Sequence, residues 1–345
     1  TNSFQGPDWT FWQARFDPRV ACLTPLLNTS CRKPLTSATE IIVVHVLLAI
    51  ISVLTVILNL LVIISICHFR QLHTPTNLIL LFLAFCDFLV GLVLLPGLIV
   101  MLKGCWFYGD LMCAFINLLI FIITSSSVGN MVLISIDRYV AICDPLHYTN
   151  KITMRRATVC ICLCWLLSVI YNGIILREAL INPERTSSCV GECVINSDSF
   201  GGAVDVVVTF TLPIIIILVL YMRVFVVAVS QARAMRSHIS AVRIQLAANV
   251  TCKKSELKAA RTLGVVVLIF LVCFCPYYCV TISGDGSVNY VVQHQSSFFS
   301  NYVLYFNSCL NPVIYALFYP WFRKAVKLIV TLQILQANSS ETNML

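Results

Sequence analysis

The last long apolar segment of the chain ends in Asn307-Ser308-Cys309-Leu310-Asn311-Pro312-Val313-Ile314-Tyr315, which continues as Ala-Leu-Phe-Tyr-Pro-Trp-Phe to residue 322. Pro312 removes one backbone donor, so it kinks a helix inside lipid. Asn307, Asn311 and Tyr315 put polar groups beside that kink, at membrane depth. Because such groups are costly in hydrocarbon, they must face partners or water inside a helix bundle. The stretch therefore predicts a helix that packs within a membrane bundle rather than a plain anchor.

Six further apolar segments precede this one. The 345 residues are 59% hydrophobic and 11% charged, whereas a soluble domain carries about 25% charged residues. A membrane-spanning helix needs about 20 apolar residues. Seven segments reach that length, at about 41–67, 76–101, 113–140, 157–177, 202–227, 259–282 and 298–318. The sequence therefore predicts an all-α membrane protein, a bundle of seven transmembrane helices.

Basic residues indicate the orientation in the membrane, because cytoplasmic loops carry an excess of Lys and Arg. If the N-terminus lies outside, sixteen of the 23 Lys and Arg residues fall on the cytoplasmic side and seven stay outside. We interpret the formal charge of +8 as this topology signal. A nucleic-acid surface is the weaker interpretation, since the basic residues are spread over several short loops. The predicted location is the plasma membrane, with the N-terminus extracellular and the C-terminus cytoplasmic.

Three parts of the chain differ in composition. Residues 1–40 form a polar outer tail, 41–318 the transmembrane domain, and 319–345 an amphipathic helix with a cytoplasmic tail. The expected amphipathic helix, which would lie on the inner membrane surface, alternates Phe322, Val326, Ile329 and Val330 with Arg323, Lys324 and Lys327. No cysteine follows Cys309 to carry a palmitoyl anchor, and 1–36 hold no apolar leader of the secretory kind.

The cysteines divide into two groups by their predicted side. Those on the outside, where disulfides form, are Cys22, Cys31, Cys105, Cys113, Cys189 and Cys193. Most others lie in apolar segments, where we expect small core fillers: Cys86, Cys160, Cys162, Cys164, Cys273, Cys275, Cys279 and Cys309. Asn28-Thr29-Ser30 is a glycosylation sequon on the outer side. Sequence alone does not fix which cysteines pair.

Two carboxylates stand inside apolar segments. Asp87 lies in the middle of the second segment, where a lone charge costs about 2.5–3.5 kcal/mol on insertion scales. It indicates a functional site, and the alternative is a packing carboxylate satisfied by Asn and Ser neighbours. Asp205 interrupts the Val-rich fifth segment eight residues before Pro213, about 12 Å along a helix and so in its outer third. The alternative for Asp205 is an ion pair with an outer-loop base, Arg177 or Arg185.

Asp137-Arg138-Tyr139 ends the third segment, and together with the Asn-Pro stretch it resembles the rhodopsin-like G-protein-coupled receptors. The run from Asn307 to Phe322 resembles one subfamily of them, the trace amine-associated receptors. Without this resemblance, Arg138 would be read as an interfacial side chain with no signalling role. The resemblance implies that Asp137 and an acid at the foot of the sixth helix hold Arg138 when the receptor is inactive, and that Arg138 is freed toward a G protein on activation. The residues carried over to this switch are Asp137, Arg138, Tyr139, Glu256, Tyr221, Tyr315, Pro312 and Phe274, the last of which stands where the family usually has Trp.

The resemblance also implies a sodium ion in the resting state, and no other cofactor is expected. The predicted sodium site consists of Asp87, Ser127, Asn307, Ser308 and Asn311, with Asn59 beside them. The resemblance further implies two disulfides, Cys113–Cys193 and Cys31–Cys189. Cys22 competes with Cys31 for the second of them.

The resemblance decides where a ligand is expected. Amine receptors normally carry an Asp on the third helix at the position that Ile120 occupies here. Some trace amine receptors, notably in fish, carry an acid at the fifth-helix position of Asp205, alone or with the third-helix one. Our hypothesis is that Asp205 binds a protonated amine, with the ligand inverted. The candidate pocket walls, for which core packing is an equal alternative, are Tyr277, Tyr278, Tyr302 and Tyr305.

The predicted protein is a receptor and not an enzyme. The resemblance implies a small cationic amine as ligand, a stimulatory heterotrimeric G protein that raises cAMP, and a role in olfactory amine detection. Arrestin is a further candidate partner, beside the surrounding membrane lipid. One alternative is a receptor of the same fold for a peptide or lipid. Another is a transporter, which would tend to show an internal repeat, and the sequence shows none.

Overall fold

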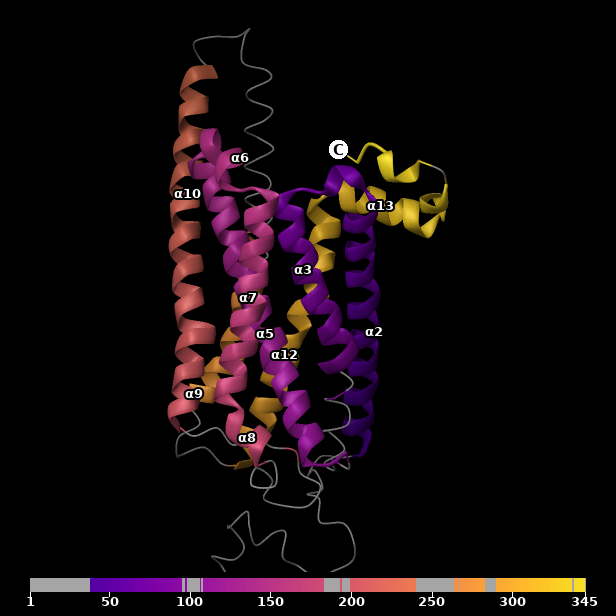
Figure 1. Cartoon of the computed structure of the whole chain (residues 1–345), viewed down its shortest axis with the longest axis vertical. Helices are drawn as coiled ribbons and strands as arrows, with labels where there is room; N and C mark the ends of the chain where they lie inside the picture. The colour runs from indigo at the N-terminus through magenta and orange to yellow at the C-terminus, as the bar shows by residue number, and fades with distance from the viewer. Residues whose placement is uncertain are drawn as a thin grey trace, which may run out of the picture.

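The computed structural model describes residues 38–94, 97, 106, 108–182, 193, 199–239, 264–265, 267–282, 290–336 and 338–344. Within these ranges the regular structure is entirely helical. Figure 1 shows the long helices side by side, with α10 reaching beyond the others at the end where the C-terminus lies. This end is the cytoplasmic one by the distribution of basic residues.

The described helices overlap all seven predicted segments, and the helical bundle confirms the predicted fold class. Their bounds are α2 Ala38–His68, α3 Pro75–Leu89 with the π-helical η3 Val90–Leu94, α5 Asp110–Cys143, α7 Met154–Ile175, α9 Ser199–Asp205 with the π-helical η6 Val206–Thr211 and α10 Leu212–Ile239, an unlabelled helix Val267–Ile282, and α12 Tyr290–Phe318. Short helices α6 (Tyr148–Lys151) and α8 (Arg177–Ile181) flank α7. Among the described residues, five helices are long and apolar enough to cross a membrane, and Val267–Ile282 is shorter.

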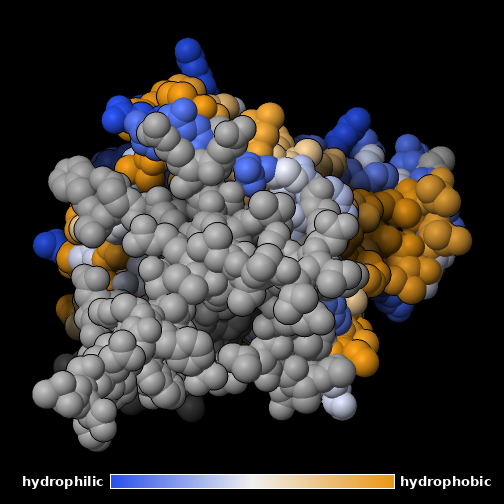
Figure 2. Space-filling model, turned by 90° about the horizontal axis from the view of Figure 1, so that it is seen from below, coloured by the Kyte–Doolittle hydropathy of each residue, from blue (hydrophilic) through white to orange (hydrophobic). Residues whose placement is uncertain are grey.

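Burial follows the pattern of a membrane bundle, with polar side chains inside and apolar ones outside. Asn59, Asp87, Asn130 and Asn311 are all fully buried, whereas Leu, Ile and Val side chains along α2, α7 and α10 are exposed. Figure 2 shows apolar side chains on the flanks of the molecule, seen from the outer end. Lipid would therefore meet the apolar surface, and the polar groups must pair with one another.

The cysteine prediction is only partly right. Cys86, Cys273 and Cys309 are buried, as expected of small core residues. Cys160, Cys162 and Cys279 are instead exposed. A thiol is apolar enough to face lipid, so an apolar segment alone does not tell which face of the helix a cysteine occupies.

One close contact joins α2 to η3 and depends on a glycine. A Cβ atom added at Gly91 would lie 3.0 Å from both Thr55 Cβ and Val56 Cγ2. The hydroxyl of Ser52 donates to the Gly91 carbonyl oxygen at 2.5 Å. Small residues let membrane helices approach closely and bond across the interface. Gly91 therefore fixes the spacing between the first two helices.

The predicted amphipathic helix after the last span is present as α13, Pro320–Val330. Trp321, Phe322 and Ala325 are buried against the bundle, and Arg323 and Lys324 are exposed. Arg323 donates to the carbonyl oxygens of Ala316 and Leu317 at 2.9 and 3.0 Å. These are unpaired acceptors at the end of α12, so Arg323 caps that helix.

The segment 338–344 folds back onto the turn η2, Arg70–Leu72, that follows α2. Figure 1 shows the C-terminus beside this turn. Glu341 pairs with Arg70 at 3.2 Å, and the Met344 backbone N–H donates to Gln71 Oε1 at 2.8 Å. Met344 is only 2% exposed and joins the main core, so this segment is packed and not merely adjacent.

Candidate functional site

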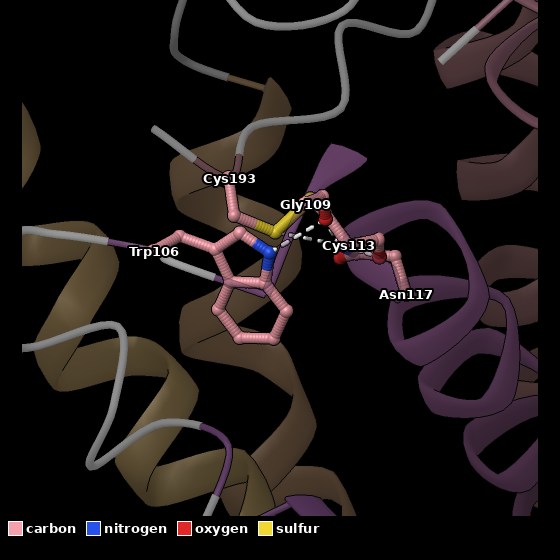
Figure 3. The surroundings of a disulfide bond; sticks show 5 residues. All are labelled: Trp106, Gly109, Cys113, Asn117 and Cys193. Carbon is pink, nitrogen blue, oxygen red and sulfur yellow. Dashed lines mark hydrogen bonds between the residues drawn. A yellow bond between two sulfur atoms is a disulfide. The ribbon is translucent and has the colours of Figure 1, made fainter. Parts of the chain in front are cut away.

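A disulfide organises the outer end of the bundle. Cys113 and Cys193 are bonded, with their Cα atoms 5.6 Å apart, which confirms the predicted pair. Figure 3 shows Trp106 and Asn117 beside it. Trp106 Nε1 donates to the Gly109 carbonyl at 2.8 Å, and Asn117 Nδ2 donates to that of Cys113 at 2.9 Å. The disulfide ties position 193 to the first turn of α5. The other predicted outer residues, Cys22, Cys31, Cys189 and the sequon at Asn28, lie outside the described residues.

Asp205 ends α9, at the point where the fifth helix becomes π-helical. The hydroxyl of Thr209 donates to Asp205 Oδ1 at 2.8 Å, and the Tyr171 hydroxyl approaches the same oxygen at 3.5 Å. In the described part of the chain Asp205 has no ion pair. Arg177, one of the alternative partners, lies 3.7 Å from Glu178 instead, and Arg185 is not described. Tyr171 was not among the residues predicted from the sequence.

Aromatic side chains lie near this carboxylate. Tyr277 and Tyr278 are close enough to Asp205 to interact with its charge. The Tyr278 ring stacks on Phe210 with centroids 4.3 Å apart and meets Tyr277 edge-on at 5.0 Å. Phe210 was not among the predicted pocket residues. The arrangement combines one carboxylate with several π faces.

The remaining predicted pocket residues pack in the same core. Ile120 is partly buried there, and Tyr305 is buried. Tyr302 has a buried hydroxyl without a hydrogen-bond partner among the described residues. Ile120 offers only apolar surface, so the third helix supplies no charge at this position.

Asp87 is buried in the bundle, among polar side chains that join three helices. Asn311 Nδ2 donates to Asp87 Oδ2 at 2.8 Å, joining α12 to α3. Asn59 Nδ2 donates to the Ser308 carbonyl at 3.0 Å, joining α2 to α12. Ser127 and Ser308 are both 5% exposed. The predicted neighbours of Asp87 are therefore buried in this region, and two amides cross-link the helices.

Several oxygens in this cluster lack a donor. Oδ1 atoms of Asp87, Asn59, Asn307 and Asn311 are buried without a hydrogen-bond partner in the described structure. Such orphaned acceptors are costly, and a cation that prefers oxygen would satisfy them. The described residues hold no group of three His, Cys, Asp or Glu that would suit a metal of higher charge. One carboxylate with neutral oxygens fits a small monovalent cation.

Arg138 is held at the cytoplasmic end of α5. Its Nε donates to Asp137 Oδ2 at 2.9 Å, and its Nη2 bonds the same carboxylate and Thr76 Oγ1, the latter at 2.7 Å. Tyr148, from α6, donates to Asp137 Oδ1 at 2.9 Å. Burial and the Asp137 charge raise the pKa of Tyr148 above its ordinary value, so its hydroxyl keeps the proton that it donates. The hydrogen bonds of Asp137 and Arg138 therefore join α3, α5 and α6.

Asp137 and Arg138 were predicted from the sequence, whereas Thr76 and Tyr148 were not. Thr76 follows the proline that starts α3, and a polar residue there is unremarkable in sequence. Tyr148 lies eleven residues after Asp137 in the segment that follows Asp-Arg-Tyr. This short separation was the only feature of the sequence that could have indicated their contact. Glu256 lies outside the described residues.

The tyrosines predicted for the switch are not bonded to Arg138. The hydroxyls of Tyr221 and Tyr315 are buried and have no hydrogen-bond partner in the part of the chain described. Phe274 is buried and packs on Phe270 with ring centroids 4.0 Å apart, and Pro312 lies inside α12. Arg138 is therefore engaged with Asp137 and Thr76, while two phenols are unsatisfied.

Comparison with known proteins identifies a receptor family. The family model described as 7 transmembrane receptor (rhodopsin family) matches residues 58–315. Trace amine-associated receptor 13c of Danio rerio is 36% identical over 335 residues, which cover 95% of this chain and 97% of that protein. Trace amine-associated receptor 7e of Rattus norvegicus is 36% identical over 92% of this chain and 90% of its own. Trace amine-associated receptor 6 of Pan troglodytes is 35% identical over 93% and 94%, respectively.

Proposed function

The chain belongs to the rhodopsin family of seven-transmembrane receptors and, within it, to the trace amine-associated receptors, and we propose that it binds an extracellular amine through Asp205. It is a multi-pass protein of the plasma membrane and a receptor of the G-protein-coupled class, not an enzyme.

The observation that carries the ligand assignment is the environment of Asp205. Its two described hydrogen bonds both fall on Oδ1, and no described cation pairs with it. A carboxylate at membrane depth needs a cationic or polar partner. A protonated amine at Oδ2 would supply one, with a charge-assisted hydrogen bond about twice as strong as a neutral one.

The aromatic rings add a second attraction for the same ligand. A cation over the face of Tyr278 or Phe210 gains about 0.5–2 kcal/mol. Because Ile120 cannot bind a cation, the charged end of the ligand lies toward the fifth helix and its apolar part toward the third. This pose is inverted relative to that of a receptor with a third-helix acid.

Signalling would proceed by a shift between two states. In the first, Arg138 is bonded to Asp137 and Thr76, as described above. In the second, Arg138 leaves Asp137 and comes within reach of the unsatisfied hydroxyls of Tyr221 and Tyr315. The amine favours the second state only by as much as it binds that state more tightly. The exposed Arg138 and inner loops then engage a stimulatory G protein, and cAMP rises.

The cluster around Asp87 is proposed to hold a sodium ion in the first state. Asp87 would supply the negative charge, and Asn311, Ser127 and Ser308 neutral oxygens. When bound, the ion supplies positive charge to acceptors that are otherwise orphaned. Its loss would accompany the change to the second state.

The proposal is tested by a cAMP screen of monoamines and diamines on the intact receptor and on Asp205→Ala. We expect the variant to lose at least about 30-fold in potency, since a hydrogen bond to a charged group contributes about 2 kcal/mol. Asp110→Asn, which alters another outer acid in the first turn of α5, is the matched control and should respond normally. Unchanged potency of Asp205→Ala across the panel would contradict the amine site. A response to a peptide or lipid alone would favour the other receptor class.

A further inference from the structure

An open groove with a volume of about 380 Å³ lies between the cytoplasmic end of α5 and α10. Tyr139 and Cys143 line it from α5. The residues that line it from α10 are Met222, Arg223, Val226 and Val227. These positions recur at a spacing of four, so each helix contributes one face. The buried pair Ile142 and Val224 packs against Tyr139, Cys143 and Val227.

The groove combines apolar walls with one cation. Met222 and Val226 are 63% and 61% exposed. Arg223 is the only charged residue in the lining, and it is close enough to Cys143 to act on the thiol. No ion pair to Arg223 occurs within the described ranges. The groove therefore offers a guanidinium group that has no described protein anion to bind.

The nearby acids at the cytoplasmic end of α5 are already engaged. Asp137 is bonded by Arg138 and Tyr148. Asp144 accepts hydrogen bonds from Lys151 at 2.8 Å and His147 at 2.7 Å. These contacts hold the pKa of Asp144 below its ordinary value. Neither carboxylate is left to neutralise Arg223.

The position of the groove indicates which anion would reach it. Leu218, Val219, Met222 and Phe225 form an exposed apolar stripe along α10 and lead to the groove. Such a stripe faces lipid in a membrane protein. The groove lies at the end of α5, where hydrocarbon gives way to head groups and long basic side chains reach the interface. The inner leaflet is also where anionic lipids concentrate.

We infer that this groove is a binding site for one anionic phospholipid of the inner leaflet. The phosphate is held by the Arg223 guanidinium, whose planar fork matches phosphate geometry. One acyl chain lies along Met222 and Val226. This site is separate from the amine site and does not depend on the identity of the ligand.

The groove lies next to the switch on the same two helices. Tyr139 follows Arg138 on α5, and Met222 follows Tyr221 on α10. A lipid that spans the two helices braces them against each other. Its presence would therefore bias how α10 moves relative to Arg138.

The test measures lipid retention by the intact receptor. The receptor is purified from nanodiscs of phosphatidylserine and phosphatidylcholine in equal amounts, and the lipids that remain bound are counted by native mass spectrometry. The intact receptor should retain phosphatidylserine in preference. Arg223→Gln should lower that retention about fivefold, the effect of one basic residue at an anionic surface. Arg155→Gln, which removes an exposed arginine at the start of α7, is the matched control and should retain as much as the unaltered receptor.

A second variant separates shape from charge. Val226→Trp fills the groove while Arg223 stays in place, and it should also reduce retention. Both variants are compared only if they elute as the unaltered receptor does and melt at a similar temperature. Equal retention by Arg223→Gln, or no preference for phosphatidylserine, overturns the inference. The inference is also overturned if either variant retains lipid normally but fails to activate the G protein in lipid-free detergent. That result would assign the groove to the G protein.

Discussion

Tyr148 donates its phenolic hydrogen to Oδ1 of Asp137 at 2.9 Å, so a short helix of the second inner loop is bonded to the residue that holds Arg138. Thr76 reaches the other carboxylate oxygen at the same distance. The acid of the Asp-Arg-Tyr motif is therefore the centre of a network and not half of a simple ion pair. In the proposed switch, each bond to Asp137 would help to keep Arg138 away from Tyr221 and Tyr315.

We expect Asp137→Asn to raise basal signalling. The substitution removes the charge from bonds that each contribute about 1.5–3 kcal/mol, so the population with Arg138 released should rise about 10- to 100-fold. Tyr148→Phe removes one bond and should give a smaller rise, about 2- to 10-fold. Basal nucleotide exchange on purified G protein measures both. Tyr108→Phe, an exposed outer tyrosine, serves as the control, and a larger effect of Tyr148→Phe than of Asp137→Asn would contradict this ranking.

Sodium should oppose amine binding through Asp87. Replacing NaCl by choline chloride should raise amine affinity of the intact receptor about fivefold, within the usual range of coupling between two sites. Asp87→Asn removes the negative charge that attracts the ion. The amine affinity of this variant should therefore no longer depend on sodium. Radioligand binding at constant ionic strength measures this. If the variant remains as sensitive to sodium as the intact receptor, the ion is held elsewhere.

Gly91→Ala should destabilise the receptor. Its new methyl group would lie 3.0 Å from Thr55 and Val56, and overpacking of this kind costs about 1–3 kcal/mol. Gly173→Ala on α7 is the matched control, because a Cβ there has no neighbour within 4 Å. The melting temperature of the solubilised receptor should fall for Gly91→Ala and be maintained or raised for Gly173→Ala. Equal melting temperatures would mean that α2 and η3 separate without cost.

Packing, more than charge, should hold the segment 338–344 on η2. The Arg70–Glu341 pair is exposed, at 71% and 63%, so Glu341→Gln should lose well under about 1 kcal/mol. Met344 is buried, so Met344→Ala should lose about 2–5 kcal/mol of docking free energy. Hydrogen exchange of the amides at 339–344 reports both. The docking would be electrostatic instead if Glu341→Gln lost the greater protection.

Long apolar segments made the helices predictable, because only a helix of about 20 residues satisfies its backbone in lipid. The ends of the helices were less predictable. The third segment was expected at 113–140, whereas α5 spans Asp110–Cys143, since polar residues continue a helix once it leaves the membrane. The fifth apolar segment was expected to end at about 227, whereas α10 continues to Ile239.

The residues that complete the sites were harder to foresee. Tyr171, Thr76 and Tyr148 are ordinary residue types whose partners lie 34, 61 and 11 positions away in sequence. Only the packing of helices brings them to Asp205 and Asp137. The contact between η2 and Met344 spans 273 positions. The two carboxylates in apolar segments, by contrast, could be predicted as site residues, because a charge in lipid costs free energy unless it has a partner.

Asp205 stands directly before the π-helical segment η6, Val206–Thr211. A π turn accommodates an additional residue, so conversion of η6 to an ordinary α-helix would rotate Asp205 by about 100° around the helix axis relative to α10. A ligand that anchors Asp205 in one direction would thereby select one winding of this segment. Ligand binding at the outer end of the fifth helix would then change the winding of η6. That change would rotate α10, which projects into the cytoplasm.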